Sequence, residues 1–144
     1  MIRYFAYGSN IDETQMCQRC RDGAVLVSIA KLHGYRFIIN TRGVATVVPQ
    51  SYSEVYGIVW SITEACEKSL DCCEGVRYKT YTKETVNVEI VTGKSVAALT
   101  YLASDSTPGS ARVGYMEKIV AAAERHRLPD KYIEELRAWL PTSS

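Results

Sequence analysis

Two short stretches of the sequence contain residues that could do chemistry. The first is Tyr7-Gly8-Ser9-Asn10, which directly follows the apolar run of residues 2–6, and the second is Glu74, which follows two cysteines. A glycine and small polar residues ahead of a helix can present main-chain amides to an anion or a developing oxyanion. A carboxylate in an apolar setting, at the negative end of a helix dipole, has a raised pKa that suits a general base near neutral pH.

Both features also have an ordinary structural interpretation. The loop could be a strand-to-helix turn in which Asn10 or Asp12 caps the helix. Glu74 could be a solvated carboxylate at a helix end, which is where isolated glutamates are commonly found. The two histidines, His33 and His126, do not combine with a serine or cysteine into a recognisable nucleophilic triad.

The five cysteines allow two interpretations. An odd number of cysteines without an export signal favours free, buried thiols over a disulfide framework. The alternative is a zinc site in which Cys17, Cys20, Cys72 and Cys73 supply the thiolates. Adjacent cysteines are awkward ligands for a tetrahedral ion, so we expect no metal.

Length and charge restrict the class of protein. The 144 residues correspond to one domain spanning 1–144, and 17 basic residues against 16 acidic ones leave no basic surface for nucleic acid. The sequence lacks a signal-peptide pattern and an apolar run long enough to cross a bilayer. We therefore expect a cytoplasmic protein that binds neither nucleic acid nor membrane.

The pattern of apolar residues indicates which elements position these side chains. It predicts strands at residues 2–6, 24–30, 34–40, 44–48, 55–62, 80–91 and 95–102, and helices at 12–19, 63–75, 112–125 and 130–139. Asp12 and Gln15 are spaced as a capping box at the start of the first helix. Because strands come in runs, the class is α+β with a mixed, mostly antiparallel sheet curled into a small barrel with flanking helices.

Several motifs occur in an order that resembles the gamma-glutamylcyclotransferases and their AIG2-like relatives. The resemblance extends over nearly the whole chain. It rests on Tyr7-Gly8-Ser9-Asn10, residues 32–37, 43–49, 55–60, Leu70-Asp71-Cys72-Cys73-Glu74-Gly75-Val76, Tyr81, Tyr115 and residues 128–133. The chain departs from the family pattern at Pro108 and Ser110, which stand farther from Tyr115 than is usual.

The resemblance implies an activity and a set of site residues. Glu74 matches the catalytic acid/base, Tyr7, Gly8, Ser9, Asn10 and Ile11 match a substrate-binding loop, and Tyr81 and Tyr115 match hydroxyls that line the cavity, with Tyr78 as an alternative to Tyr81. In such enzymes the substrate's alpha-amine attacks its own gamma-carbonyl, releasing 5-oxoproline and an amine without a cofactor. Two alternatives remain: a cyclotransferase that acts on a larger gamma-glutamyl-bearing biosynthetic intermediate or isopeptide, and a catalytically inactive ligand-binding member of the same fold. A homodimer is compatible with either.

Overall fold

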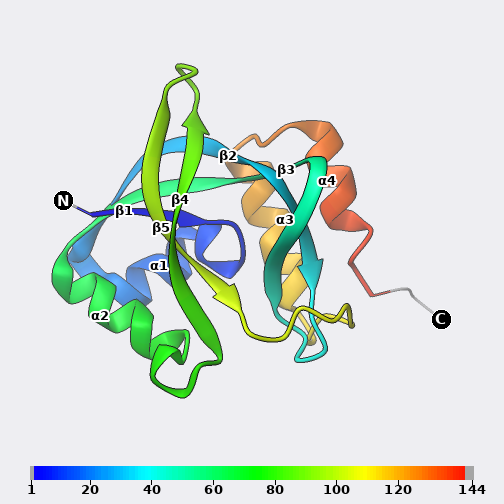
Figure 1. Ribbon diagram of the computed structural model, residues 1–144, viewed down its shortest axis with the longest axis horizontal. Coiled ribbons are helices and arrows are strands. Elements are labelled where there is room, and N and C mark those ends of the chain that lie inside the picture. The colour runs from blue at the N-terminus through cyan, green and yellow to red at the C-terminus, as the bar shows by residue number, and fades with distance from the viewer. Residues whose placement is uncertain (1, 142–144) are drawn as a thin grey trace.

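The computed structural model describes residues 2–141, in which five strands close into a barrel. Around the barrel the strands follow the order β1-β3-β2-β4-β5, and all neighbours are antiparallel except β1 and β5 (Figure 1). The strands are β1 (Ile2–Ala6), β2 (Ala24–Ile39), β3 (Ala45–Ile62), β4 (Tyr81–Ile90) and β5 (Ser95–Ala103). The helices are α1 (Glu13–Cys20), α2 (Glu64–Cys73), α3 (Tyr115–Arg125) and α4 (Asp130–Arg137). The expected α+β barrel class is confirmed.

Two strands run longer than the sequence indicated. Residues 24–30 and 34–40 were expected to be separate strands, but β2 continues through them with an irregularity beside Gly34, whose φ is +82°. Residues 44–48 and 55–62 likewise belong to the single strand β3, and Pro49 pairs with Tyr35 instead of closing the strand. Glycine and proline often stand where a strand ends, but a bulge bends a strand without ending it. Gly34 and Pro49 therefore did not mark strand ends here.

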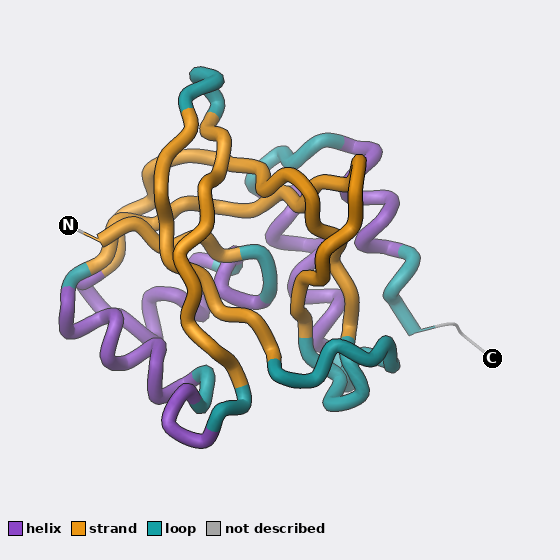
Figure 2. Tube along the Cα trace, viewed as in Figure 1, coloured by secondary structure: helices purple, strands orange, loops and turns teal. Residues whose placement is uncertain are grey.

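The chain between β3 and β5 follows the sequence expectation. α2 begins after Thr63, whose side chain accepts a hydrogen bond from the amide of Cys66 at 3.1 Å. β4 and β5 form the expected antiparallel hairpin, and its turn contains Gly93 at a φ of +84°. Figure 2 shows this hairpin rising beyond the body of the barrel.

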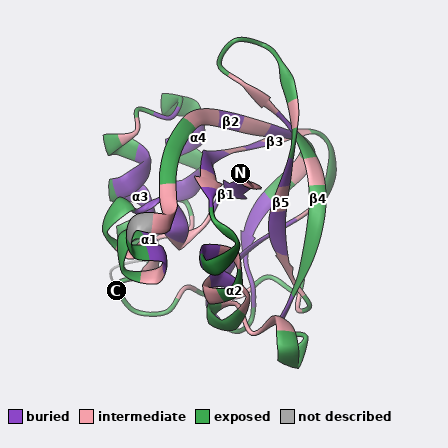
Figure 3. Ribbon diagram, turned by 90° about the vertical axis from the view of Figure 1, so that its left-hand side faces the viewer, coloured by how far each residue is buried: buried purple, intermediate pink, exposed green. Residues whose placement is uncertain are grey.

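The helices lie on two sides of the barrel and bury apolar faces against it. Figure 1 shows α1 and α2 together on one side and α3 and α4 on the other. Figure 3 shows buried residues concentrated on the inward faces of strands and helices. On α3 the fully buried residues recur at helical spacing: Met116, Ile119, Ala122 and Ala123. Between residues 2 and 141 no helix is long and apolar enough to cross a membrane.

Two local expectations were wrong. Asp12 precedes α1 but makes no side-chain cap; its carboxylate accepts a hydrogen bond from Arg125 at 2.8 Å. Gln15 turns to Ser9 and Asn10, so no capping box forms. The Asp12 carboxylate thus pairs with Arg125 of α3 and does not cap α1, and no local sequence pattern reveals this long-range pair.

The cysteines also differ from expectation, because Cys20 and Cys66 form a disulfide between α1 and α2. Packing of the two helices brings their Cα atoms to 4.8 Å, within the usual range for a disulfide. Cys17, Cys72 and Cys73 are free thiols but exposed. The pairing is 46 residues apart in sequence, so only the tertiary fold could reveal it.

Candidate active site

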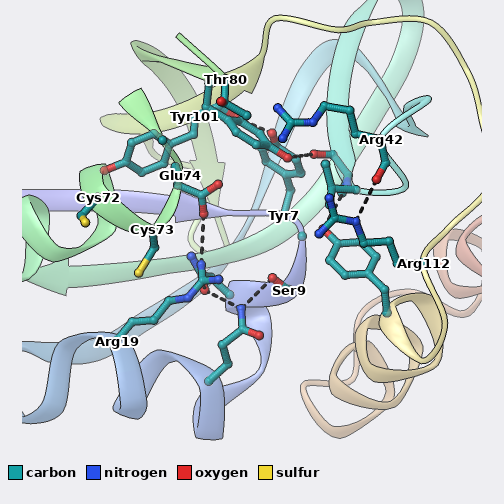
Figure 4. A pocket seen from close by; sticks show the side chains of 18 of the residues that line it. Tyr7, Ser9, Arg19, Arg42, Cys72, Cys73, Glu74, Thr80, Tyr101 and Arg112 are labelled. Atoms are coloured by element: carbon teal, nitrogen blue, oxygen red, sulfur yellow. Dashed lines mark hydrogen bonds and ion pairs between the residues drawn. The ribbon is translucent and has the colours of Figure 1, made fainter. Parts of the chain in front are cut away.

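A cavity of about 430 Å³ brings together most of the residues singled out in the sequence. Its wall includes the loop after β1, the end of α2, the start of β4 and the loops that follow β2 and β5 (Figure 4). Tyr7, Gly8, Ser9 and Asn10 all line it, and so does Glu74, which comes more than sixty residues later in the chain. The barrel therefore assembles one site from two distant segments.

The loop after β1 is held in a single tight turn. The amide of Ile11 donates to the carbonyl of Gly8 at 3.1 Å, and residues Ser9–Ile11 form one 3₁₀ turn before α1 begins at Glu13. The φ of Gly8 is −106°, so this glycine is not needed for a left-handed conformation. Its missing side chain matters instead for space, since a Cβ there would lie 3.2 Å from that of Ala45. Glycine thus keeps this part of the wall open.

Asn10 fixes the loop to its surroundings from both sides. Its side-chain amide donates to the Tyr4 hydroxyl at 2.9 Å, and its side-chain oxygen accepts from Gln15 at 2.8 Å and Arg19 at 3.0 Å. The residue is buried, and Trp60 donates to its carbonyl at 3.1 Å. A buried polar side chain with all these partners is rigid, so the neighbouring main chain is preorganised.

The loop leaves hydrogen-bond donors available at the cavity wall. Within residues 2–141 the main-chain amides of Gly8, Ser9 and Asn10 have no acceptor, whereas that of Ile11 is used in the turn. Amides held in this way can bind a carboxylate or an oxyanion without reorganising. Ile11 itself is buried and does not line the cavity, unlike the other four loop residues.

Glu74 lies at the end of α2 with its carboxylate turned into the cavity (Figure 4). Its amide completes the helix by donating to the carbonyl of Leu70 at 2.8 Å, and Gly75 reverses the chain with a φ of +65°. Its side chain is 16% exposed and accepts a hydrogen bond from Arg19 at 3.1 Å. The fold thus directs this carboxylate inward through a glycine-terminated helix.

Two opposing effects act on the pKa of Glu74. Burial raises the pKa, because the charged carboxylate loses water, and the Arg19 guanidinium opposes that rise by charge and hydrogen bonding. The balance leaves the pKa above the ordinary value for a glutamate. A carboxyl group whose pKa is raised from its ordinary value is better suited to accepting a proton and returning it.

Tyrosine hydroxyls form much of the remaining wall. The Tyr81 hydroxyl donates to the carbonyl of Ala45 at 2.7 Å, and the Tyr115 hydroxyl accepts a hydrogen bond from the amide of Ala45 at 2.9 Å. Burial raises the pKa of both hydroxyls, so they remain neutral. Tyr78 is 79% exposed, so Tyr81 is the residue that faces the cavity.

Three arginines at the cavity were not singled out by sequence reasoning. Arg19 pairs with Glu74, whereas Arg42 and Arg112 lie on the other side in Figure 4. Arg42 and Arg112 are exposed loop residues, and such arginines have no sequence signature. For Arg19 the one available signal was its position four residues after Gln15 on α1, which places both side chains on the same face of the helix. Tyr4 and Tyr101, which also line the cavity, were missed because strand alternation places them without marking them as functional.

Possible metal ligands are not grouped in the part of the chain that the structure describes. Residues 2–141 contain no cluster of three or more histidine, cysteine, aspartate or glutamate side chains that could hold an ion. In addition, the disulfide removes Cys20 from the four thiols considered for zinc. The residues of the cavity are suited to binding anions and transferring protons.

Comparison with known proteins extends these observations. A sequence model described as the AIG2-like family matches residues 54–136. Proteins named gamma-glutamylcyclotransferase from Mus musculus and Homo sapiens are each 28% identical over 96% of this chain and 78% of their own length. A solved structure titled gamma-glutamyl cyclotransferase superposes with a TM-score of 0.90 at 27% identity, covering 99% of this chain and 90% of that one. The resemblance seen in the sequence is thereby confirmed at the level of family and fold.

Proposed function

We propose that this chain, which belongs to the AIG2-like family, is a cyclotransferase acting on gamma-glutamyl compounds. The products are 5-oxoproline and a free amine. The observation that carries this proposal is the cavity in which Glu74, held by Arg19 at 3.1 Å, faces a loop with unused main-chain amides. The named relatives that match nearly all of the chain are enzymes of this type.

The reaction requires one new bond and breaks one old bond. The substrate's alpha-nitrogen attacks the gamma-carbonyl carbon, which closes a five-membered ring, and the bond from that carbon to the amide nitrogen then breaks. Because nucleophile and electrophile belong to one molecule, binding the reactive conformer supplies much of the acceleration. Glu74 accepts the proton from the attacking amine and delivers it to the departing nitrogen.

The loop residues are assigned the complementary role. The amides of Gly8, Ser9 and Asn10 are positioned to bind either the oxygen of the tetrahedral intermediate or the alpha-carboxylate of the substrate. The hydroxyls of Tyr81 and Tyr115 shape the cavity, and their neutral state avoids repulsion with Glu74. Ile11 supports the loop from behind, because it is buried away from the cavity.

The test is to identify the products formed from gamma-glutamylalanine. We expect 5-oxoproline and alanine in equal amounts, and no product from the same dipeptide with its alpha-amine acetylated, because that nitrogen cannot attack. Glutamate in place of 5-oxoproline would indicate hydrolysis and would contradict the proposal. So would turnover of the acetylated compound.

A further inference from the structure

Two arginines at the mouth of the cavity have no assigned role in the reaction. Arg42 follows β2, and Arg112 stands in the loop before α3, seventy residues later. Both side chains line the cavity, and Figure 4 shows them together, across from Arg19 and Glu74. Two segments distant in sequence therefore bring two guanidinium groups to one wall.

The loops that bear these arginines are joined by hydrogen bonds. The Arg112 amide donates to the carbonyl of Gly43 at 3.0 Å, and its Nε donates to the carbonyl of Arg42 at 2.9 Å. Gly43 makes this contact feasible, because a Cβ there would lie 2.7 Å from Cγ of Arg112, and its φ is +83°. The arginine pair is consequently built into the fold.

The charges of the pair are not neutralised by the protein. Neither Arg42 nor Arg112 has a carboxylate partner among residues 2–141. Asp105, in the same loop as Arg112, accepts hydrogen bonds from Thr41 and from the amide of Thr107 instead. Arg42 lines the cavity together with Tyr81, and its guanidinium opposes the rise that burial causes in the pKa of the Tyr81 hydroxyl.

The charge balance of the cavity points to an anionic ligand. Its charged lining residues are Arg19, Glu74, Arg42 and Arg112, and the first two compensate each other, which leaves two positive charges. In the proposed reaction, the glutamyl part of the substrate contacts Glu74 and the amides of the loop after β1. The leaving amine is the remaining part of the molecule, and it can extend toward the exposed mouth.

On this basis, and resting on the proposed function, we propose that Arg42 and Arg112 form a subsite for a negatively charged group on the leaving amine. The substrates it favours carry a carboxylate or a phosphate there. Arginine suits this role because its planar guanidinium donates two parallel hydrogen bonds to such groups. The pair determines which gamma-glutamyl compounds are used and takes no part in proton transfer.

Three probes that differ in the leaving amine test this subsite. Gamma-glutamylethylamide lacks the anion, gamma-glutamylalanine adds one carboxylate to the same skeleton, and gamma-glutamyl-O-phosphoethanolamine adds a phosphate. For the wild type we expect kcat/KM to be about ten- to a hundredfold higher for an anionic probe, as charged hydrogen bonds typically produce. The better of the two anionic probes identifies the anion.

The double variant Arg42→Gln/Arg112→Gln is expected to lose this preference and to retain turnover of the ethylamide within about twofold. Arg3→Gln is the matched control, because Arg3 is exposed on β1 and does not line the cavity. An equal loss for all three probes would overturn the proposal, since it would mean that the pair holds the glutamyl part. An unchanged preference would overturn it as well.

Measuring the affinity for the probes tests the arginine subsite independently of the proposed cyclotransferase activity. In a Glu74→Gln background, titration calorimetry with the same probes is expected to show tighter binding of the anionic ones, and Arg42→Gln/Arg112→Gln is expected to abolish the difference. If the wild type makes no 5-oxoproline but this binding pattern holds, the cyclotransferase function fails and the subsite stands. Equal affinities for all probes, or no binding of any, would refute the subsite.

Discussion

Removing the disulfide between Cys20 and Cys66 is expected to destabilise the fold substantially, and Cys66→Ala is the simplest perturbation. The 46-residue separation gives a loop-closure contribution of about 4 kcal/mol in the chain-entropy treatment. At roughly 3 °C per kcal/mol for a domain of this size, the midpoint of thermal unfolding falls by about 12 °C. Both cysteines are buried, so we expect the full loss of stability to appear in the unfolding midpoint.

The assay is thermal unfolding by circular dichroism with and without a phosphine reductant, after equilibration in mild denaturant to give the reductant access. The oxidised wild type should unfold well above Cys66→Ala, reduction should bring it close to the variant, and the variant should not respond to reductant. Cys17→Ala serves as the control, because Cys17 is an exposed free thiol. A wild type that unfolds at the same temperature as Cys66→Ala under oxidising conditions would show that the disulfide does not stabilise the fold.

Three further predictions concern the barrel and its cavity. Gly57→Ala places a Cβ 2.1 Å from the carbonyl oxygen of Ala6, so we expect at least 1–3 kcal/mol of destabilisation in urea unfolding; wild-type stability would contradict this contact. Arg19→Ala removes the group that opposes the burial-raised pKa of Glu74, so the acidic limb of the kcat/KM profile should move to higher pH; a shift to lower pH would reverse the assignment. Tyr115→Phe leaves a main-chain amide without its acceptor, which should cost about 1–3 kcal/mol in chemical denaturation, and a neutral effect would mean that water replaces it.

The sequence was sufficient for the features that depend on local pattern. Strand β1 follows from an apolar run, the β4–β5 hairpin from two alternating segments joined by a glycine turn, and helix α2 from apolar residues at helical spacing after Thr63. All of these patterns involve neighbouring residues. The continuity of β2 and β3 does not, because a bulge at Gly34 and a paired Pro49 resemble strand ends in sequence. Pairing with a neighbouring strand keeps such segments extended.

The residues of the site likewise include some that the sequence indicated and others that only the fold brings together. The Tyr7–Asn10 motif and Glu74 were singled out by their local chemistry, and the family resemblance assigned them roles. The structure places them around one cavity. Arg19, Arg42 and Arg112 were missed, because their importance lies in what they face across the cavity, and that depends on the closed barrel. Long-range pairings such as the Cys20–Cys66 disulfide and the Asp12–Arg125 ion pair were missed for the same reason.

If Glu74 transfers the proton in ring closure, Glu74→Gln should form 5-oxoproline far more slowly than the wild type. Glutamine can still accept the hydrogen bond from Arg19, so the unfolding midpoint should change little. Loss of general acid/base catalysis should lower kcat by about 10²–10⁴-fold. A Glu74→Gln protein that is folded and retains full activity would show that another group transfers the proton.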